Sequence, residues 1–134
     1  RCLSDGVGCP GTRVALADER GEVAVMLDGQ PQMEVGCHTD IMDSCPKSVA
    51  IPMLLRSANP QIIAVDEITQ ARDLAAMEEA AYCGVRFLAT LHADSVDDLH
   101  RRPLLQKLQK MHLFEKAITI HMADTLRRYT IRDL

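Results

Sequence analysis

The stretch QIIAVDE at residues 61–67 decides how the rest of the chain is interpreted. Four apolar residues run without interruption from Ile62 to Val65 and end in two adjacent carboxylates. A short continuous apolar run is typical of a strand that is buried on both faces, as in a parallel sheet. Ligands of open α/β sheets bind just beyond the carboxyl ends of such strands. The stretch therefore predicts a buried strand that presents Asp66 and Glu67 at a ligand-binding edge.

The composition bounds the class of protein. The chain has 134 residues, of which 47% are hydrophobic, so it can form one domain with a sizeable core. Aromatic residues make up 3% and the net charge is −4, which argues against a nucleic-acid partner, since such proteins use exposed rings and basic surfaces. No apolar run approaches the length of a membrane span. The five cysteines form no CxxC pair, and this fits a reduced, cytoplasmic setting.

Strand and helix signals alternate along the chain. Strands are expected at 12–16, 23–27, 61–66 and 85–91, and helices at 44–58 and 71–83 and from Pro103 onward. Such alternation is typical of a mostly parallel sheet covered by helices, which makes the expected fold class α/β. Residues 28–43 carry loop signals, and Ser44 is the expected cap of the next helix, which Pro52 should interrupt.

Two further features complete the expected architecture. A helix start is predicted at Ser95, ahead of the helix that begins at Pro103. Residues 117–122 and 126–131 alternate between apolar and polar side chains on either side of a turn, which predicts a C-terminal β-hairpin.

Polar side chains follow three of the expected strands at the points where they end. These are the segment DERGE at 18–22, the pair at 66–67, and Thr90 with His92. Since parallel strands place their carboxyl ends on one edge, we expect the three groups to converge on one site. Taken singly, each group has a simpler explanation, such as a solvated turn or a hydrogen-bonded structural histidine.

The glycine-rich segment GVGCPGTR at 6–13 imitates a phosphate-binding loop. Such a loop follows a strand, opens a helix, and carries a lysine that reaches the phosphates. Here Thr12 stands where the lysine belongs, and the segment precedes a strand. We interpret it as a helix-to-strand connection, so no triphosphate cradle is evident in these residues.

An ordered series of segments resembles the stage III sporulation protein AA family. The matching segments are 14–24, 39–40, 45–47, 55–60, 61–68, 90–93 and 101–104. That family is related to the hexameric ATPases that drive type II, type IV pilus and type IV secretion machines. The resemblance covers nearly the whole chain.

The resemblance implies a RecA-like ATPase domain, of which residues 1–134 would be the C-terminal part, with the first strand and the phosphate loop upstream. ATP and Mg²⁺ would be the cofactors. The full-length protein would be a homo-oligomer, a hexamer in this family, and would energise a secretion-like channel during sporulation through membrane channel proteins. It would be cytoplasmic and held at the membrane by those partners. The chain by itself is expected to be inactive, because the phosphate cradle and its lysine are missing.

The resemblance also implies roles for individual residues. Asp66 would bind Mg²⁺, directly or through water, and Glu67 would polarise the attacking water. Glu19 or Glu22 could share that task, and which of the acidic residues is the general base stays open.

Three further residues complete the implied site. Arg20 and Thr90 would contact the nucleotide. His92 would sense the γ-phosphate and relay its loss to a neighbouring subunit.

Two other interpretations stay open. A receiver-type signalling domain would also place acidic residues at 18–19, an aspartate at Asp66 and a threonine at Thr90, but it needs a lysine after a later strand, and Lys116 comes before its strand. A noncatalytic assembly module would keep the fold and lose the catalytic carboxylate or the histidine, and both are retained here.

Overall fold

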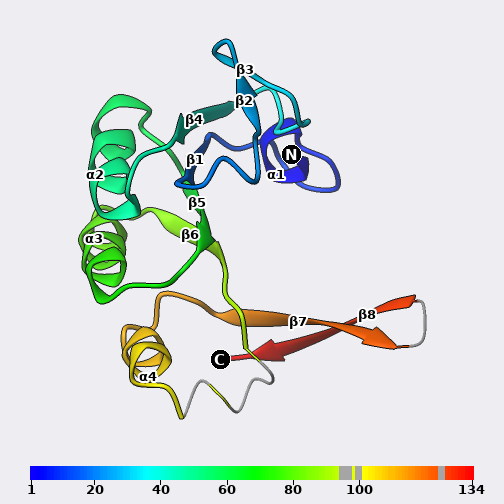
Figure 1. Cartoon of the computed structure of the whole chain (residues 1–134), viewed down its shortest axis with the longest axis vertical. Coiled ribbons are helices and arrows are strands. Elements are labelled where there is room, and N and C mark those ends of the chain that lie inside the picture. Colours follow the sequence, from blue (N-terminus) through cyan, green and yellow to red (C-terminus); the bar gives the residue numbers. More distant parts are fainter. Residues whose placement is uncertain (94–97, 99–100, 124–125) are drawn as a thin grey trace. The chain divides into compact units, whose positions relative to one another are not determined.

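The computed structural model describes residues 1–93, 98, 101–123 and 126–134. The chain divides into two compact units, Arg1–Leu91 and His92–Leu134 (Figure 1).

The first unit is built on a four-stranded parallel sheet. Its strands are β1 (Val14–Asp18), β4 (Thr39–Asp43), β5 (Ile62–Glu67) and β6 (Arg86–Thr90), and they lie in the order β4-β1-β5-β6. The α/β prediction is confirmed. Because all four strands run the same way, their carboxyl ends share one edge, as the sequence analysis required.

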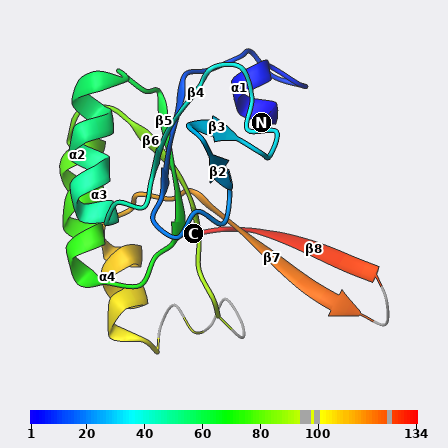
Figure 2. The same cartoon turned by 45° about the horizontal axis from the view of Figure 1, so that its top comes forward.

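Helices α2 (Lys47–Ser57) and α3 (Ala71–Tyr82) pack side by side against this sheet (Figures 1 and 2). The central strand β1 is buried at every position, and the apolar run of β5 supplies Ile62, Ile63 and Val65 to the core. Ile51 and Leu74 from the two helices are fully buried. The stretch at 61–67 is therefore an interior strand, as predicted.

The expected loop at 28–43 is wrong in part, because it contains a strand of the main sheet. A small hairpin of β2 (Met26–Leu27) and β3 (Gln30–Pro31) leads to β4, which pairs in parallel with β1 from Val14↔Thr39 to Asp18↔Asp43. The sequence of β4, TDIMD, has weak strand character. It becomes a strand because the neighbouring edge of β1 offers unpaired backbone groups, so tertiary pairing overrides local preference.

The expected start of the second helix was also wrong. Helix α2 begins at Lys47 with Pro46 as its N-cap residue, and it runs through Pro52. Ser44 adopts a left-handed backbone conformation, with φ of 54°, and its hydroxyl donates to Asp43. A residue in that conformation does not take the extended backbone of an N-cap.

Helix ends elsewhere follow the expected chemistry. The short helix α1 (Cys2–Asp5) ends at Gly6, whose left-handed φ of 77° suits glycine. A Cβ at Gly6 would lie 2.9 Å from the backbone nitrogen of Gly11, so the turn also needs the missing side chain. Residues 6–13 thus connect a helix to a strand, as predicted. Helix α3 starts with a reciprocal capping box between Gln70 and Asp73.

The second unit contains helix α4 (Pro103–Lys110) and a hairpin of β7 (Lys116–Ala123) and β8 (Leu126–Asp133). The predicted helix at Pro103 and the predicted C-terminal hairpin are confirmed, and Leu105 and Leu108 are the buried residues of α4. The predicted helix start at Ser95 lies outside the described residues. Among the helices that the structure describes, none combines the length and the apolar character needed to span a membrane.

We predict that Leu74→Ala lowers the free energy of unfolding of the first unit by about 3–5 kcal/mol, because it leaves a cavity among fully buried side chains. Leu27→Ala is the matched control, since Leu27 is 59% exposed and should cost less than about 0.5 kcal/mol. Urea unfolding curves followed by circular dichroism measure both. Equal losses in the two variants would contradict the core assignment.

Candidate functional site

The candidate site lies at the carboxyl edge of the parallel sheet. Strands β1 and β5 are paired up to Ala17↔Val65, so Asp18 and Asp66 each follow a residue of the last paired position. The segments 18–22 and 66–67 are thereby brought together at one edge, as the sequence analysis expected.

Asp66 is buried, and its two oxygens have different environments. Oδ1 accepts a hydrogen bond of 2.6 Å from Lys47 Nζ. Oδ2 is also buried but has no hydrogen-bond partner within the described part of the chain. A buried acceptor without a partner costs about 1–3 kcal/mol, so such an oxygen is suited to a further cation or donor.

Lys47 joins the two acidic segments. Its Nζ lies 2.6 Å from Asp66 Oδ1 and 2.7 Å from Glu19 Oε2, and its side chain is only 3% exposed. Burial acts to lower the pKa of Lys47, but the hydrogen bonds from its ammonium to Asp66 and Glu19 outweigh burial and raise that pKa. The hydrogen bond from Lys47 lowers the pKa of Glu19. The ammonium therefore favours the charged form of Glu19.

Lys47 was not predicted as a site residue, although the sequence contains a signal for it. The buried residues of α2 are Lys47, Ala50, Ile51 and Leu54, which follow the i, i+3, i+4, i+7 spacing of one helix face. A lysine in register with such an apolar face must be paired with a carboxylate if it is buried. Extending the apolar periodicity of this helix toward its first residue would have identified Lys47 as a buried, paired residue.

Asp18 has a structural task in the acidic segment. It is fully buried, and its carboxylate accepts hydrogen bonds from the backbone N–H groups of Glu22, Val23 and Ala24 at 2.9, 3.0 and 2.8 Å. These bonds fold residues 18–24 into a turn. The turn leaves the Glu22 side chain 66% exposed.

Glu67 faces a more open environment than Asp66. Its carboxylate lies 3.6 Å from the Arg20 guanidinium, which is also 3.9 Å from Glu22, and its side chain is 28% exposed. The register between β5 and β6 shifts between Val65 and Glu67, which places Glu67 opposite Thr90. Successive side chains of a strand point to opposite faces, so the two consecutive carboxylates meet different partners.

The third predicted group is only partly placed. Thr90 belongs to the first unit, is exposed, and stands opposite Glu67 in the sheet register. His92 belongs to the second unit, where its carbonyl accepts a hydrogen bond of 3.1 Å from Arg102. Its approach to Asp66 therefore stays a prediction.

The donor set fits a magnesium ion that takes few protein ligands. In the described residues no three His, Cys, Asp or Glu side chains are grouped to hold a metal by themselves. Magnesium at nucleotide sites is usually held by one or two carboxylates together with phosphate oxygens and water. The partnerless Oδ2 of Asp66 can supply one such ligand.

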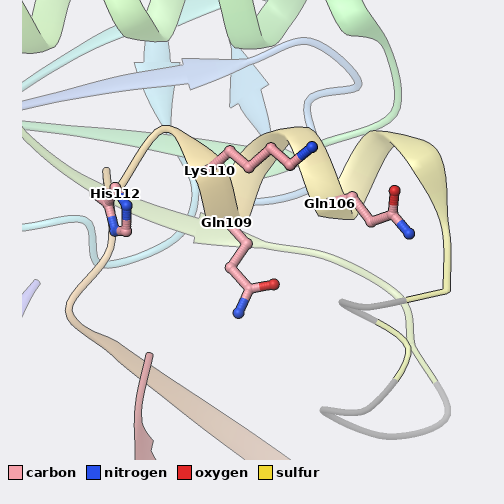
Figure 3. A pocket seen from close by; sticks show the side chains of 4 residues that line it. All are labelled: Gln106, Gln109, Lys110 and His112. Carbon is pink, nitrogen blue, oxygen red and sulfur yellow. The ribbon is translucent and has the colours of Figure 1, made fainter.

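A hollow in the second unit has a different character. It is lined by Gln106, Gln109, Lys110 and His112 of α4 and the turn that follows it. Figure 3 shows these side chains pointing in different directions, so they do not converge on one point. Lys116, the lysine considered for a receiver-type site, pairs with Asp133 within the β7–β8 hairpin.

Comparison with known proteins gives one consistent answer. The family model described as "Sporulation stage III, protein AA" matches residues 1–130. The Stage III sporulation protein AA of Bacillus subtilis (strain 168) is 35% identical to the chain over 111 residues. The match covers 83% of this chain and 36% of that protein. The chain thus spans about a third of the length of the curated relative.

We predict that Asp18→Asn destabilises the first unit by about 1–3 kcal/mol, because an amide cannot accept all three backbone hydrogen bonds. Asp28→Asn is the control, since Asp28 is exposed and lies in the adjacent β2–β3 turn. Chemical denaturation measures both variants. A loss for Asp18→Asn no larger than that of the control would contradict the structural role.

The Lys47–Glu19 pair predicts a pH dependence of stability. The pKa of Glu19 is lowered in the folded state, so its contribution is present above about pH 5 and is lost as the pH falls through the lowered pKa. The pKa of Lys47 is raised, so its contribution is present at neutral pH and is lost as the pH rises through the raised pKa.

Comparison of the parent chain with Glu19→Gln isolates the loss of stability at low pH that is due to Glu19. Asp73, whose pKa burial raises, acts with the opposite sign but is common to both proteins. As the pH is lowered from 6 to 3, the free energy of unfolding should fall more steeply in the parent chain than in Glu19→Gln. Identical slopes in the two proteins would show that the pair contributes no acid sensitivity.

Proposed function

The chain belongs to the Sporulation stage III, protein AA family, and from this membership we propose that it is part of an ATP-hydrolysing motor of the secretion ATPase type. Its sheet would be the C-terminal part of a RecA-like domain, with the phosphate-binding elements contributed by other parts of the full-length protein. The observation that carries the proposal is the buried Asp66 carboxylate at the carboxyl edge of β5, followed at once by Glu67.

Asp66 is suited to hold a magnesium ion. It is buried, it ends a central strand, and its Oδ2 has no partner among the described residues. Bound magnesium would neutralise the charge that develops on the transferred phosphoryl group. Strand β5, which is paired on both sides, positions the carboxylate.

Glu67 is better suited than Glu19 to orient the attacking water. A general base must be reachable by water and able to accept a proton. The two side chains are almost equally exposed, at 28% for Glu67 and 27% for Glu19. The hydrogen bond from Lys47 lowers the pKa of Glu19, however, and makes Glu19 the poorer base. The Glu22 side chain is 66% exposed and lies 3.9 Å from the Arg20 guanidinium.

Two residues of the first unit would support the reaction at the rim of the site. Arg20 lies 3.6 Å from Glu67 and can orient that carboxylate, or turn toward a phosphate group when nucleotide is bound. Thr90 stands opposite Glu67 with an exposed side chain that can donate to a phosphate oxygen. The proposed role of His92 as a γ-phosphate sensor rests on the family resemblance.

The cellular role follows from the family. We propose a homo-oligomeric ring, a hexamer, that energises a secretion-like channel during sporulation and contacts the membrane through channel proteins. The cofactors would be ATP and Mg²⁺, and nucleic acid would not be a partner.

A noncatalytic assembly module is the second candidate, and one observation favours it. Both catalytic carboxylates already face protein cations, since Lys47 pairs with Asp66 and Arg20 with Glu67. A module of this kind would keep these pairs in every state and turn over no nucleotide.

We predict that Glu67→Gln in the full-length protein lowers the rate of ATP hydrolysis at least about 100-fold, because the amide cannot accept a proton from water. Binding of a fluorescent ATP analogue should stay within about twofold of the parent, since Asp66 is unchanged. Phosphate release and fluorescence titration measure the two quantities.

Glu79→Gln on the exposed face of α3 is the matched control and should leave both quantities unchanged. Unchanged hydrolysis in Glu67→Gln would refute the catalytic assignment. A parent protein that binds ATP but never hydrolyses it would favour the assembly module.

A further inference from the structure

The environment of Lys47 contains more than a structural ion pair needs. Three charged groups from three separate elements meet there: Lys47 at the start of α2, Asp66 at the end of β5, and Glu19 just after β1. One ammonium faces two carboxylates, and one carboxylate oxygen, Asp66 Oδ2, has no partner in the described chain. The cluster therefore has a carboxylate oxygen, Asp66 Oδ2, that could accept a further hydrogen bond or bind a cation.

Lys47 occupies the place of a cation. Its Nζ lies 2.6 Å from an oxygen of the same carboxylate that offers Oδ2 to a metal. A divalent ion bound at Asp66 would be within a few ångströms of the ammonium, and two cations at that distance repel strongly in a site that excludes water. The present hydrogen bond and full occupation of Asp66 by a metal are therefore in competition.

We propose that Lys47 is a positioning residue that acts as a resident counter-ion, holding Asp66 and Glu19 until a divalent cation takes over Asp66. The exchange moves Lys47 Nζ away from Asp66 Oδ1 while its bond to Glu19 Oε2 is kept. Because Glu19 follows β1 and is 27% exposed, it can accompany the ammonium toward solvent. Lys47 thus never becomes a buried cation without a partner, which would be costly.

The exchange would couple metal binding to the acidic segment. Lys47 connects Asp66 to Glu19, and Glu19 is next to Arg20, which contacts Glu67. When the cation binds, Lys47 and Glu19 would move together away from Asp66. This movement would shift the position of the acidic segment, which also carries Arg20. This inference extends the proposed function, but it concerns cation binding alone and can be tested without hydrolysis.

The test measures Mn²⁺ binding to the whole chain without nucleotide, by electron paramagnetic resonance at pH 7. Lys47→Met removes the charge and keeps the length of the side chain, so Mn²⁺ should bind at least about tenfold more tightly than to the parent. Lys47→Arg keeps the charge and should stay within about twofold of the parent. Lys107→Met, at an exposed lysine of α4, is the matched control and should change nothing.

A double variant assigns the gain to the site. Lys47→Met combined with Asp66→Asn should lose the increased affinity, because the carboxylate that Lys47 released is gone. A gain that survives Asp66→Asn, or equal affinity of Lys47→Met and the parent, would overturn the inference. Neither result would alter the outcome of the Glu67→Gln hydrolysis experiment.

A second measurement covers the case in which Lys47→Met does not fold. In the parent chain, the buried ammonium of Lys47 should give a protected ¹⁵N–¹H resonance. Titration with Mg²⁺ should shift this resonance and speed its exchange with water, as the ammonium leaves Asp66. A resonance that stays unchanged at saturating Mg²⁺ would overturn the inference.

Discussion

The ammonium of Lys47, held between Asp66 and Glu19, is the constraint on which the site depends. Its two short hydrogen bonds join the start of α2 to the carboxyl ends of β1 and β5. Buried charges are tolerated only when they are paired, so in the absence of a bound cation these hydrogen bonds hold the three elements together.

Neighbouring acidic residues have different tasks because their surroundings differ. Asp18 accepts three backbone hydrogen bonds and shapes the turn, while Glu19 is paired with Lys47. Asp66 and Glu67 are adjacent in sequence, but Asp66 is buried beside Lys47, whereas Glu67 is partly exposed beside Arg20. Burial and partners, rather than residue type, separate the structural carboxylates from those available for chemistry.

The fold was predictable where local pattern and burial agree. The run at 62–65, the helix expected at 71–83, the Pro103 helix and the alternating hairpin all follow from the periodicity of apolar residues and from residues that end helices. Strand β4 was missed because TDIMD has little strand preference, and only the free edge of β1 makes it a strand. Ser44 was mistaken for a cap because its left-handed backbone depends on the turn between β4 and α2.

The amino-acid sequence alone determined the parallel α/β class, the convergence of residues 18–22 and 66–67, and the family, because these depend on the order and periodicity of residues along the chain. The tertiary structure decided which carboxylates are engaged. It paired Lys47 with Asp66, placed Glu67 beside Arg20 and left Asp66 Oδ2 without a partner in the described chain. Such pairings join residues 19 to 47 positions apart, and only the folded core brings them within hydrogen-bonding or ion-pair distance.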